Sequence, residues 1–71
     1  MMHRQLAGVV WHRQGQFIDL IYADGEADHL IGSQGVAAGL AREAGLARVP
    51  TPDDRACWVV QVRNRQVESV G

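Results

Sequence analysis

The chain has 71 residues, of which 46% are apolar, 21% charged and 6% aromatic, and its formal net charge is −1. This composition fits one small globular domain over residues 1–71; it excludes a disordered chain, and no stretch reaches the roughly 18 consecutive apolar residues of a spanning helix. Cys57 is the one cysteine, so no intramolecular disulfide can form, and the N-terminal residues do not resemble a secretory signal. We therefore expect a cytoplasmic protein.

The first half of the chain predicts a β-hairpin and a candidate third strand. Two runs rich in β-branched and aromatic residues, 6–13 and 17–23, flank a Gln-Gly-Gln loop at 14–16, which is typical of a hairpin. In the second run Ile18, Leu20 and Tyr22 share one face, which we expect to be the core face. Asp24-Gly25 is a turn signal, after which residues 26–31 can return as a short antiparallel strand.

The period of the apolar residues changes after Gly32. Apolar side chains at 36, 37, 40, 41 and 44 form one helical stripe. Ser33 is a good N-cap, and Gly45 stands where a left-handed residue ends a helix, which predicts a helix over about 33–44. Glycines at 35 and 39 each cost this helix roughly 1 kcal/mol relative to alanine, so packing must hold it in place.

The second half predicts a loop, a strong strand and a candidate edge strand. Two prolines favour a loop over 47–54. Residues 56–63 then have the strongest strand pattern in the chain, and residues 66–70 could add an edge strand. The fold class is therefore α+β: a mainly antiparallel sheet of three to five strands, in the order β-β-(β)-α-β-(β), with the helix packed on one face. The expected core residues are Val9, Trp11, Ile18, Leu20, Tyr22, Leu40, Trp58, Val60 and Val62.

No set of side chains has the spacing of a catalytic or metal site. The alternating carboxylates of residues 24–28 do not match the calcium-binding loop. That loop requires Gly at position 6 and Glu at position 12, where this chain has His29 and Gly35. The three histidines and Cys57 lack zinc-site spacing, and Cys57 in an apolar strand is more often a small hydrophobic residue than a reactive thiol. We therefore predict no catalytic, cofactor-binding or metal-binding residue, no cofactor and no enzymatic activity.

Nucleic-acid binding is the alternative function. Arg13, Arg63 and Arg65 could gather with Trp11 beside the first hairpin turn, and arginines next to an aromatic ring suit single-stranded nucleic acid through phosphate pairing and base stacking. The alternative for Trp11 is a place in the core. All seven basic residues are arginine, but the net charge gives no support for a nucleic-acid partner.

The order of the predicted elements resembles one known family. The hairpin, the short third strand, Gly32-Ser33 opening an alanine-rich helix and the Val-Pro-Thr-Pro segment at 49–52 look like the HicB-type antitoxin domain over residues 8–62. The segment with Pro, Gly and Cys that this family carries between its second and third strands is absent here. The resemblance implies a truncated ribonuclease-H-like fold and a self-associating, non-catalytic module that would neutralise an RNA-directed toxin.

Small size predicts a partner. A domain near 70 residues buries only about 60% of the surface that its unfolded chain exposes, and such domains often need a disulfide, a metal or a second subunit. Since the first two are not indicated, we expect a homodimer, with a further protein partner as another option and no membrane contact. The leading hypothesis is thus a non-catalytic protein-interaction module.

Overall fold

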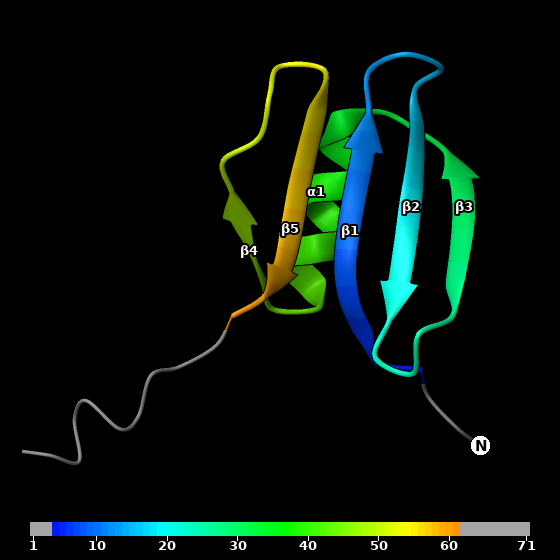
Figure 1. Cartoon of the computed structure of the whole chain (residues 1–71), viewed down its shortest axis with the longest axis vertical. Coiled ribbons are helices and arrows are strands. Elements are labelled where there is room, and N and C mark those ends of the chain that lie inside the picture. The colour runs from blue at the N-terminus through cyan, green and yellow to red at the C-terminus, as the bar shows by residue number, and fades with distance from the viewer. Residues whose placement is uncertain (1–3, 62–71) are drawn as a thin grey trace, which may run out of the picture.

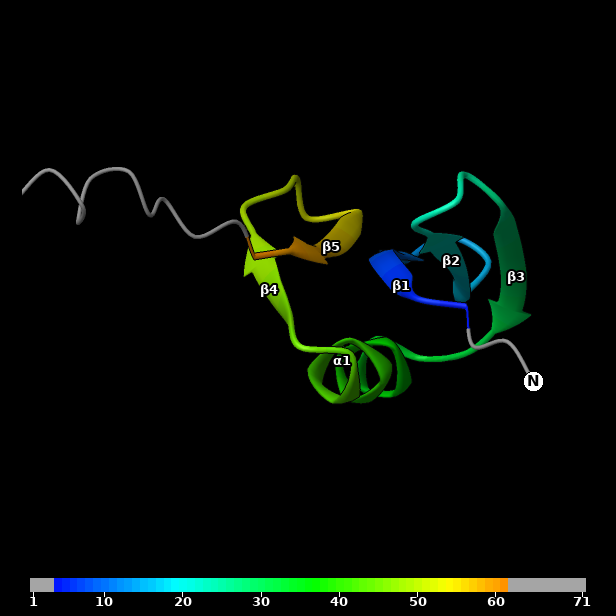
Figure 2. The ribbon, with the colours of Figure 1, turned by 90° about the horizontal axis from the view of Figure 1, so that it is seen from below.

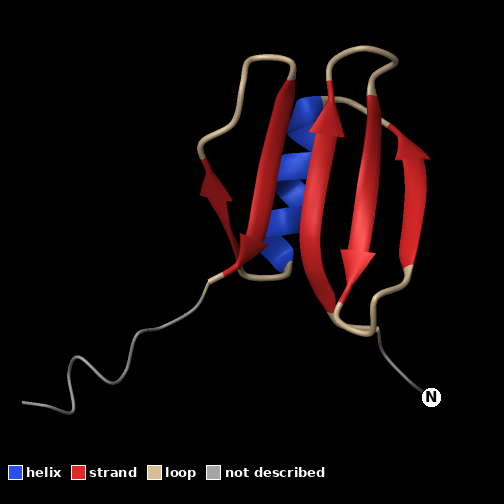
Figure 3. Cartoon of the chain, in the orientation of Figure 1, coloured by secondary structure: helices blue, strands red, loops and turns tan. Residues whose placement is uncertain are grey.

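The computed structural model describes residues 4–61, which form a five-stranded antiparallel sheet and a helix (Figure 1, Figure 3). The α+β fold class is confirmed. The elements in chain order are β1 (Leu6–His12), β2 (Phe17–Tyr22), β3 (Ala27–Ile31), α1 (Gln34–Glu43), β4 (Leu46–Val49) and β5 (Arg55–Val60).

The strands lie in the order β3-β2-β1-β5-β4, and every neighbouring pair is antiparallel. The first three strands form a meander, and α1 then connects β3 at one edge of the sheet to β4 at the other. Figure 2 shows that α1 lies on one side of the sheet and that no other described element covers the opposite side. The helix contacts β1, β4 and β5, so the core lies between α1 and the middle of the sheet.

Local signals explain where the helix begins and ends. The side chain of Ser33 accepts a hydrogen bond from the backbone N–H of Val36, as expected for an N-cap. Gly45 has a φ of +74° and donates its N–H to the carbonyl of Arg42 at 3.0 Å, which ends the helix and turns the chain into β4. Both caps were predicted from the sequence.

The buried core is small: Val9, Trp11, Ile18, Ala37, Ala41, Ala56 and Trp58. Ala37 and Ala41 on the helix leave room for the two tryptophans, and the indole N–H of Trp11 donates to the carbonyl of Gly32 at 3.1 Å. Four of the expected core residues are confirmed: Val9, Trp11, Ile18 and Trp58. Three others are half-buried: Leu20, Tyr22 and Leu40.

Two predictions are wrong, and others lie outside the described residues. Residues 47–49 of the expected loop over 47–54 belong to β4, because a proline biases only its preceding residue, and that bias toward extended geometry lets Val49 end a strand. Val60, the last residue of β5, is 45% exposed and is not part of the core. The expected core residue Val62, the end of the predicted strand 56–63, and the candidate strand 66–70 all fall outside residues 4–61.

Candidate functional site

The side of the sheet opposite α1, called here the open face, is the most distinctive surface of the molecule. Because side chains alternate along a strand, the residues between the buried ones of β1, β2 and β5 point away from the helix. The pairing register aligns them in rows that cross the sheet. The open face comprises Val10, His12, Phe17, Asp19, Ile21, Ala27, His29, Ile31, Ala47, Val49, Arg55, Cys57 and Val59.

Most side chains of the open face are apolar and accessible to solvent. Ile21 is 38% exposed, Val59 is 37% exposed, and Ile31 at the end of β3 is 82% exposed. Val10 and Phe17 are half-buried between them. Single exposed apolar residues are ordinary, but a group of them on one face of a sheet marks a surface that another molecule can cover.

Three polar side chains form a connected cluster within this apolar surface. His12 Nε2 lies 2.9 Å from Asp19 Oδ2, and His29 Nδ1 lies 2.5 Å from Asp19 Oδ1. An ionised carboxylate has only acceptors, so both histidines present an N–H to Asp19. The ring of Phe17 stacks on that of His12, with centroids 4.2 Å apart and an interplanar angle of 10°. Strands β1, β2 and β3 thus each contribute one member of the cluster.

The surroundings of Asp19 favour its charged form. Partial burial by itself raises the pKa of the carboxyl, but the hydrogen bonds and the attraction of His12 and His29 outweigh burial, so the pKa of Asp19 lies below its ordinary value of 3.8. The side chain of Asp19 is 24% exposed, whereas that of His29 is 71% exposed. The cluster is therefore a partly shielded carboxylate whose outer histidine is open to solvent.

The neighbours of the cluster limit the groups that could act together with it. Among residues 4–61, no group of three or more His, Cys, Asp or Glu side chains has the arrangement of a metal site. Cys57 is half-buried in β5 and is separated from β2 by the whole of β1, which places it roughly 10 Å from Asp19 at ordinary strand spacing. Paired His and Asp side chains can instead match charged groups on a surface that covers the open face.

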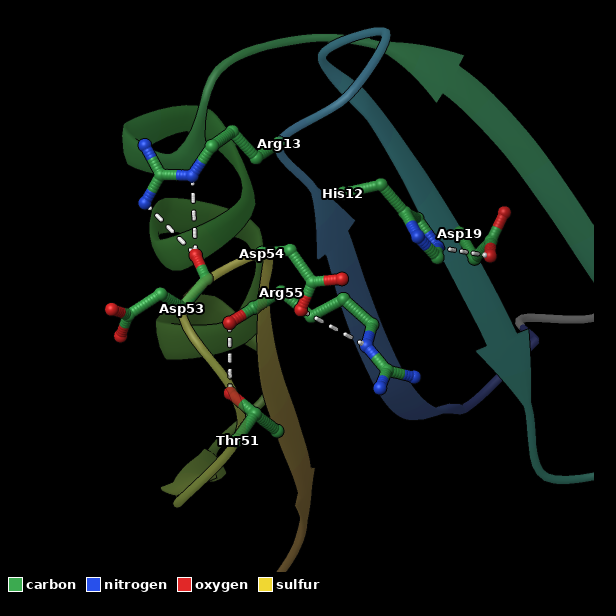
Figure 4. Close-up of polar contacts among 7 residues, drawn as sticks. All are labelled: His12, Arg13, Asp19, Thr51, Asp53, Asp54 and Arg55. Atoms are coloured by element: carbon green, nitrogen blue, oxygen red, sulfur yellow. Dashed lines mark hydrogen bonds and ion pairs between the residues drawn. The ribbon is translucent and has the colours of Figure 1, made fainter.

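A second polar cluster holds the loop before β5 against the end of β1 (Figure 4). Arg13 donates from Nε and Nη2 to the carbonyl of Asp53, at 3.2 and 2.9 Å, and its backbone N–H donates to the carbonyl of Asp54 at 2.9 Å. The Thr51 hydroxyl donates to the carbonyl of Arg55 at 2.8 Å. These contacts fix the loop that leads from β4 into β5, so Arg13 has a structural task.

Of the four predicted nucleic-acid-binding residues, Trp11 and Arg13 lie within the described part of the chain. Trp11 is 4% exposed and lies in the core, with the Arg13 guanidinium 5.7 Å from its ring centroid. β5 runs antiparallel to β1, so its Arg55 end, not its C-terminal end, lies beside Arg13. Arg63 and Arg65 fall outside the described residues. Nucleic-acid binding stays a prediction.

The histidine–aspartate cluster was missed by the sequence analysis, which treated the histidines as scattered. A usable signal was present. The tight turns after His12 and Tyr22 fix the register of both hairpins, which places Asp19 directly opposite His29 and diagonal to His12. Three residues far apart in the chain thereby become neighbours. The side chain of His12 is 27% exposed, so this member of the cluster is partly accessible to solvent.

Comparison with known protein families, with curated proteins and with solved structures found no match for this chain. The resemblance to HicB-type antitoxin domains therefore stays a prediction. Within residues 4–61, no helix has the length and apolar character required to cross a membrane.

Proposed function

We propose that the protein is a non-catalytic interaction module that forms a homodimer through the open face. The exposed apolar side chains of the open face carry this proposal: a sheet covered by a helix on one side leaves Ile21, Ile31 and Val59 in water on the other. Burying such surface is favourable by about 25 cal/mol for each Å² removed from water. The core of seven residues is small, so this additional burial would matter to stability.

The dimensions of the open face are adequate for a modest interface. Five strands about 4.8 Å apart, each about 20 Å long, give a footprint of roughly 500 Å² for each copy in projection. Two such footprints reach about 1,000 Å², the lower limit for a specific interface, and side-chain relief raises the accessible area above the projected area. A second copy of the same face is therefore large enough to form a stable partner.

The charges on the open face are compatible with a second copy. The face carries an acid, Asp19, between two histidines, and a base, Arg55, on β5. In a two-fold symmetric pair each surface meets itself, so a face with both signs of charge can set an acid of one copy against a base of the other. A reducing cytoplasmic setting fits this module, since its single cysteine, Cys57, has no partner for an intramolecular disulfide.

Sedimentation equilibrium at micromolar concentration tests the proposal. We expect the wild-type protein to have about twice the monomer mass of 7.8 kDa. Ile31→Asp and Ile21→Asp should shift the protein toward the monomer, because each variant would bury a carboxylate in the interface. Val36→Asp is the matched control: Val36 is 51% exposed on the helix, away from the open face, and this variant should remain a dimer.

The proposal fails if the wild-type protein is monomeric throughout this concentration range, or if all three aspartate variants retain the dimer mass. Far-UV circular dichroism checks that each variant is folded. Retention of single-stranded RNA at low salt, lost in the double variant Arg63→Ala/Arg65→Ala, would instead favour the nucleic-acid alternative.

A further inference from the structure

A separate pocket lies on the helix side of the sheet, away from the open face. It has a volume of about 390 Å³ and lies where the end of α1, β4 and the end of β5 meet. Two arginines, Arg42 and Arg48, line it together with the Trp58 ring, Leu46 and the amide of Gln61. Its volume is within the range of small-molecule sites.

Local structure explains why the two arginines converge. Arg42 lies in the last turn of α1, and the left-handed Gly45 then reverses the chain into β4. Arg48 is directly opposite Trp58 in the β4–β5 register, and its guanidinium carbon lies 5.4 Å from the centroid of the Trp58 ring. The lining of the pocket thus combines apolar side chains with two positively charged ones.

The structural roles of Arg42 and Arg48 leave the hydrogen-bonding capacity of their guanidinium groups unexplained. Arg42 offsets the negative end of the helix dipole, and Arg48 gains from the face of the Trp58 ring. Neither role uses the five N–H donors that a guanidinium carries. Within residues 4–61, the arginine ion pairs are those of Arg4 and Arg55, and the arginine side-chain hydrogen bonds are those of Arg13.

The lining of the pocket selects for an anion. Among residues 4–61, no acidic side chain lines it, so no described residue balances its two positive charges inside the pocket. Guanidinium groups bind carboxylate and phosphate oxygens through paired, charge-assisted hydrogen bonds. A carboxylate has two oxygens, enough for one such paired contact. A phosphate monoester has three terminal oxygens and close to two negative charges, which matches two guanidiniums.

We propose that this pocket binds a small molecule that carries a terminal phosphate group. Arg42 and Arg48 hold the phosphate, and the remainder of the ligand lies along Leu46 and the Gln61 amide. The proposal does not depend on the dimer, because the pocket and the open face are on opposite sides of the sheet.

NMR with ribose 5-phosphate as the probe tests this proposal at constant ionic strength. We expect the side-chain Nε–H signals of Arg42 and Arg48 and the indole N–H signal of Trp58 to shift, and those of Arg4 and Trp11 to stay in place. Arg42→Gln and Arg48→Gln should each weaken binding by about tenfold or more, as expected for loss of a charge-assisted contact. Arg4→Gln removes the same charge outside the pocket and should bind as the wild type does.

Three results of the NMR titration with ribose 5-phosphate would overturn the proposal. They are the absence of shifts at saturating probe, equal shifts at all arginines, and loss of binding in Arg4→Gln to the same degree as in the pocket variants. Dimethyl phosphate, a diester with one negative charge, should bind more weakly than ribose 5-phosphate. Equal binding of the two would contradict a site for terminal phosphates and point to a nucleic-acid backbone.

Discussion

Replacing Trp58 by alanine tests the packing at the centre of the fold. Trp58 is 6% exposed, lies opposite Val9 in the β1–β5 pairing and supports Arg48 on its ring. Truncating a buried tryptophan costs about 3–5 kcal/mol, and loss of the cation–π contact adds about 0.5–1 kcal/mol. A domain of this size has a free energy of unfolding of roughly 3–10 kcal/mol. Trp58→Ala should therefore leave a large fraction of the protein unfolded.

Thermal and urea unfolding followed by far-UV circular dichroism measure this loss. The melting temperature should fall by more than about 12 °C, at 4–8 °C for each kcal/mol in a small domain. Val60→Ala is the matched control, because Val60 follows two residues later on the same strand and face but is 45% exposed. It should cost less than about 1 kcal/mol. If Trp58→Ala lowers the free energy of unfolding no more than Val60→Ala does, the packing of Trp58 does not stabilise the core as argued.

Three further predictions concern single positions. Gly32→Ala should lower the free energy of unfolding in urea by about 1–3 kcal/mol, because a Cβ there would lie 2.8 Å from Cδ1 of the fully buried Ile18. Gly39→Ala is the control: a Cβ there has nothing within 4 Å, so this variant should raise the free energy of unfolding by about 0.5–1 kcal/mol. Similar effects of the two variants would refute the packing argument. Ser33→Ala removes the N-cap acceptor and should cost about 1 kcal/mol, while Ser33→Asn, which restores an acceptor, should recover most of it. The pKa of Asp19 is lower in the folded than in the unfolded state, so the stabilisation that this carboxylate contributes is present above pH 3.8 and is lost as the pH falls below that value. Urea titrations across this pH range should show that the free energy of unfolding of Asp19→Asn falls less steeply with acid than that of the wild type. An equally steep fall would refute a stabilising role of the cluster.

Local signals in the sequence were sufficient for most elements. The alternation of Ile18 and Leu20 with polar or outward residues defines the core face of β2, and Ser33 and Gly45 define the two ends of α1. β4 was missed because its four residues are too few for a period to appear and because prolines follow directly. Short edge strands are defined by their pairing partner, here β5, and not by their own composition.

The two candidate sites differ in how far the sequence predicts them. The cluster around Asp19 follows from hairpin register and was within reach of the sequence. The pocket between Arg42 and Arg48 was not, because it requires β4 to pair with β5 and to place Arg48 opposite Trp58.

The position of β1 has a consequence for how this sheet is assembled during synthesis. β1 lies between β2, which follows it directly, and β5, the last strand of the described chain. One hydrogen-bonding edge of β1 therefore stays unpaired until β5 leaves the ribosome, and an unpaired edge is a template for strands of other molecules. At high concentration the β4–β5 hairpin of one molecule can add to β1 of a neighbour with the same contacts, so slow or crowded refolding favours exchanged dimers.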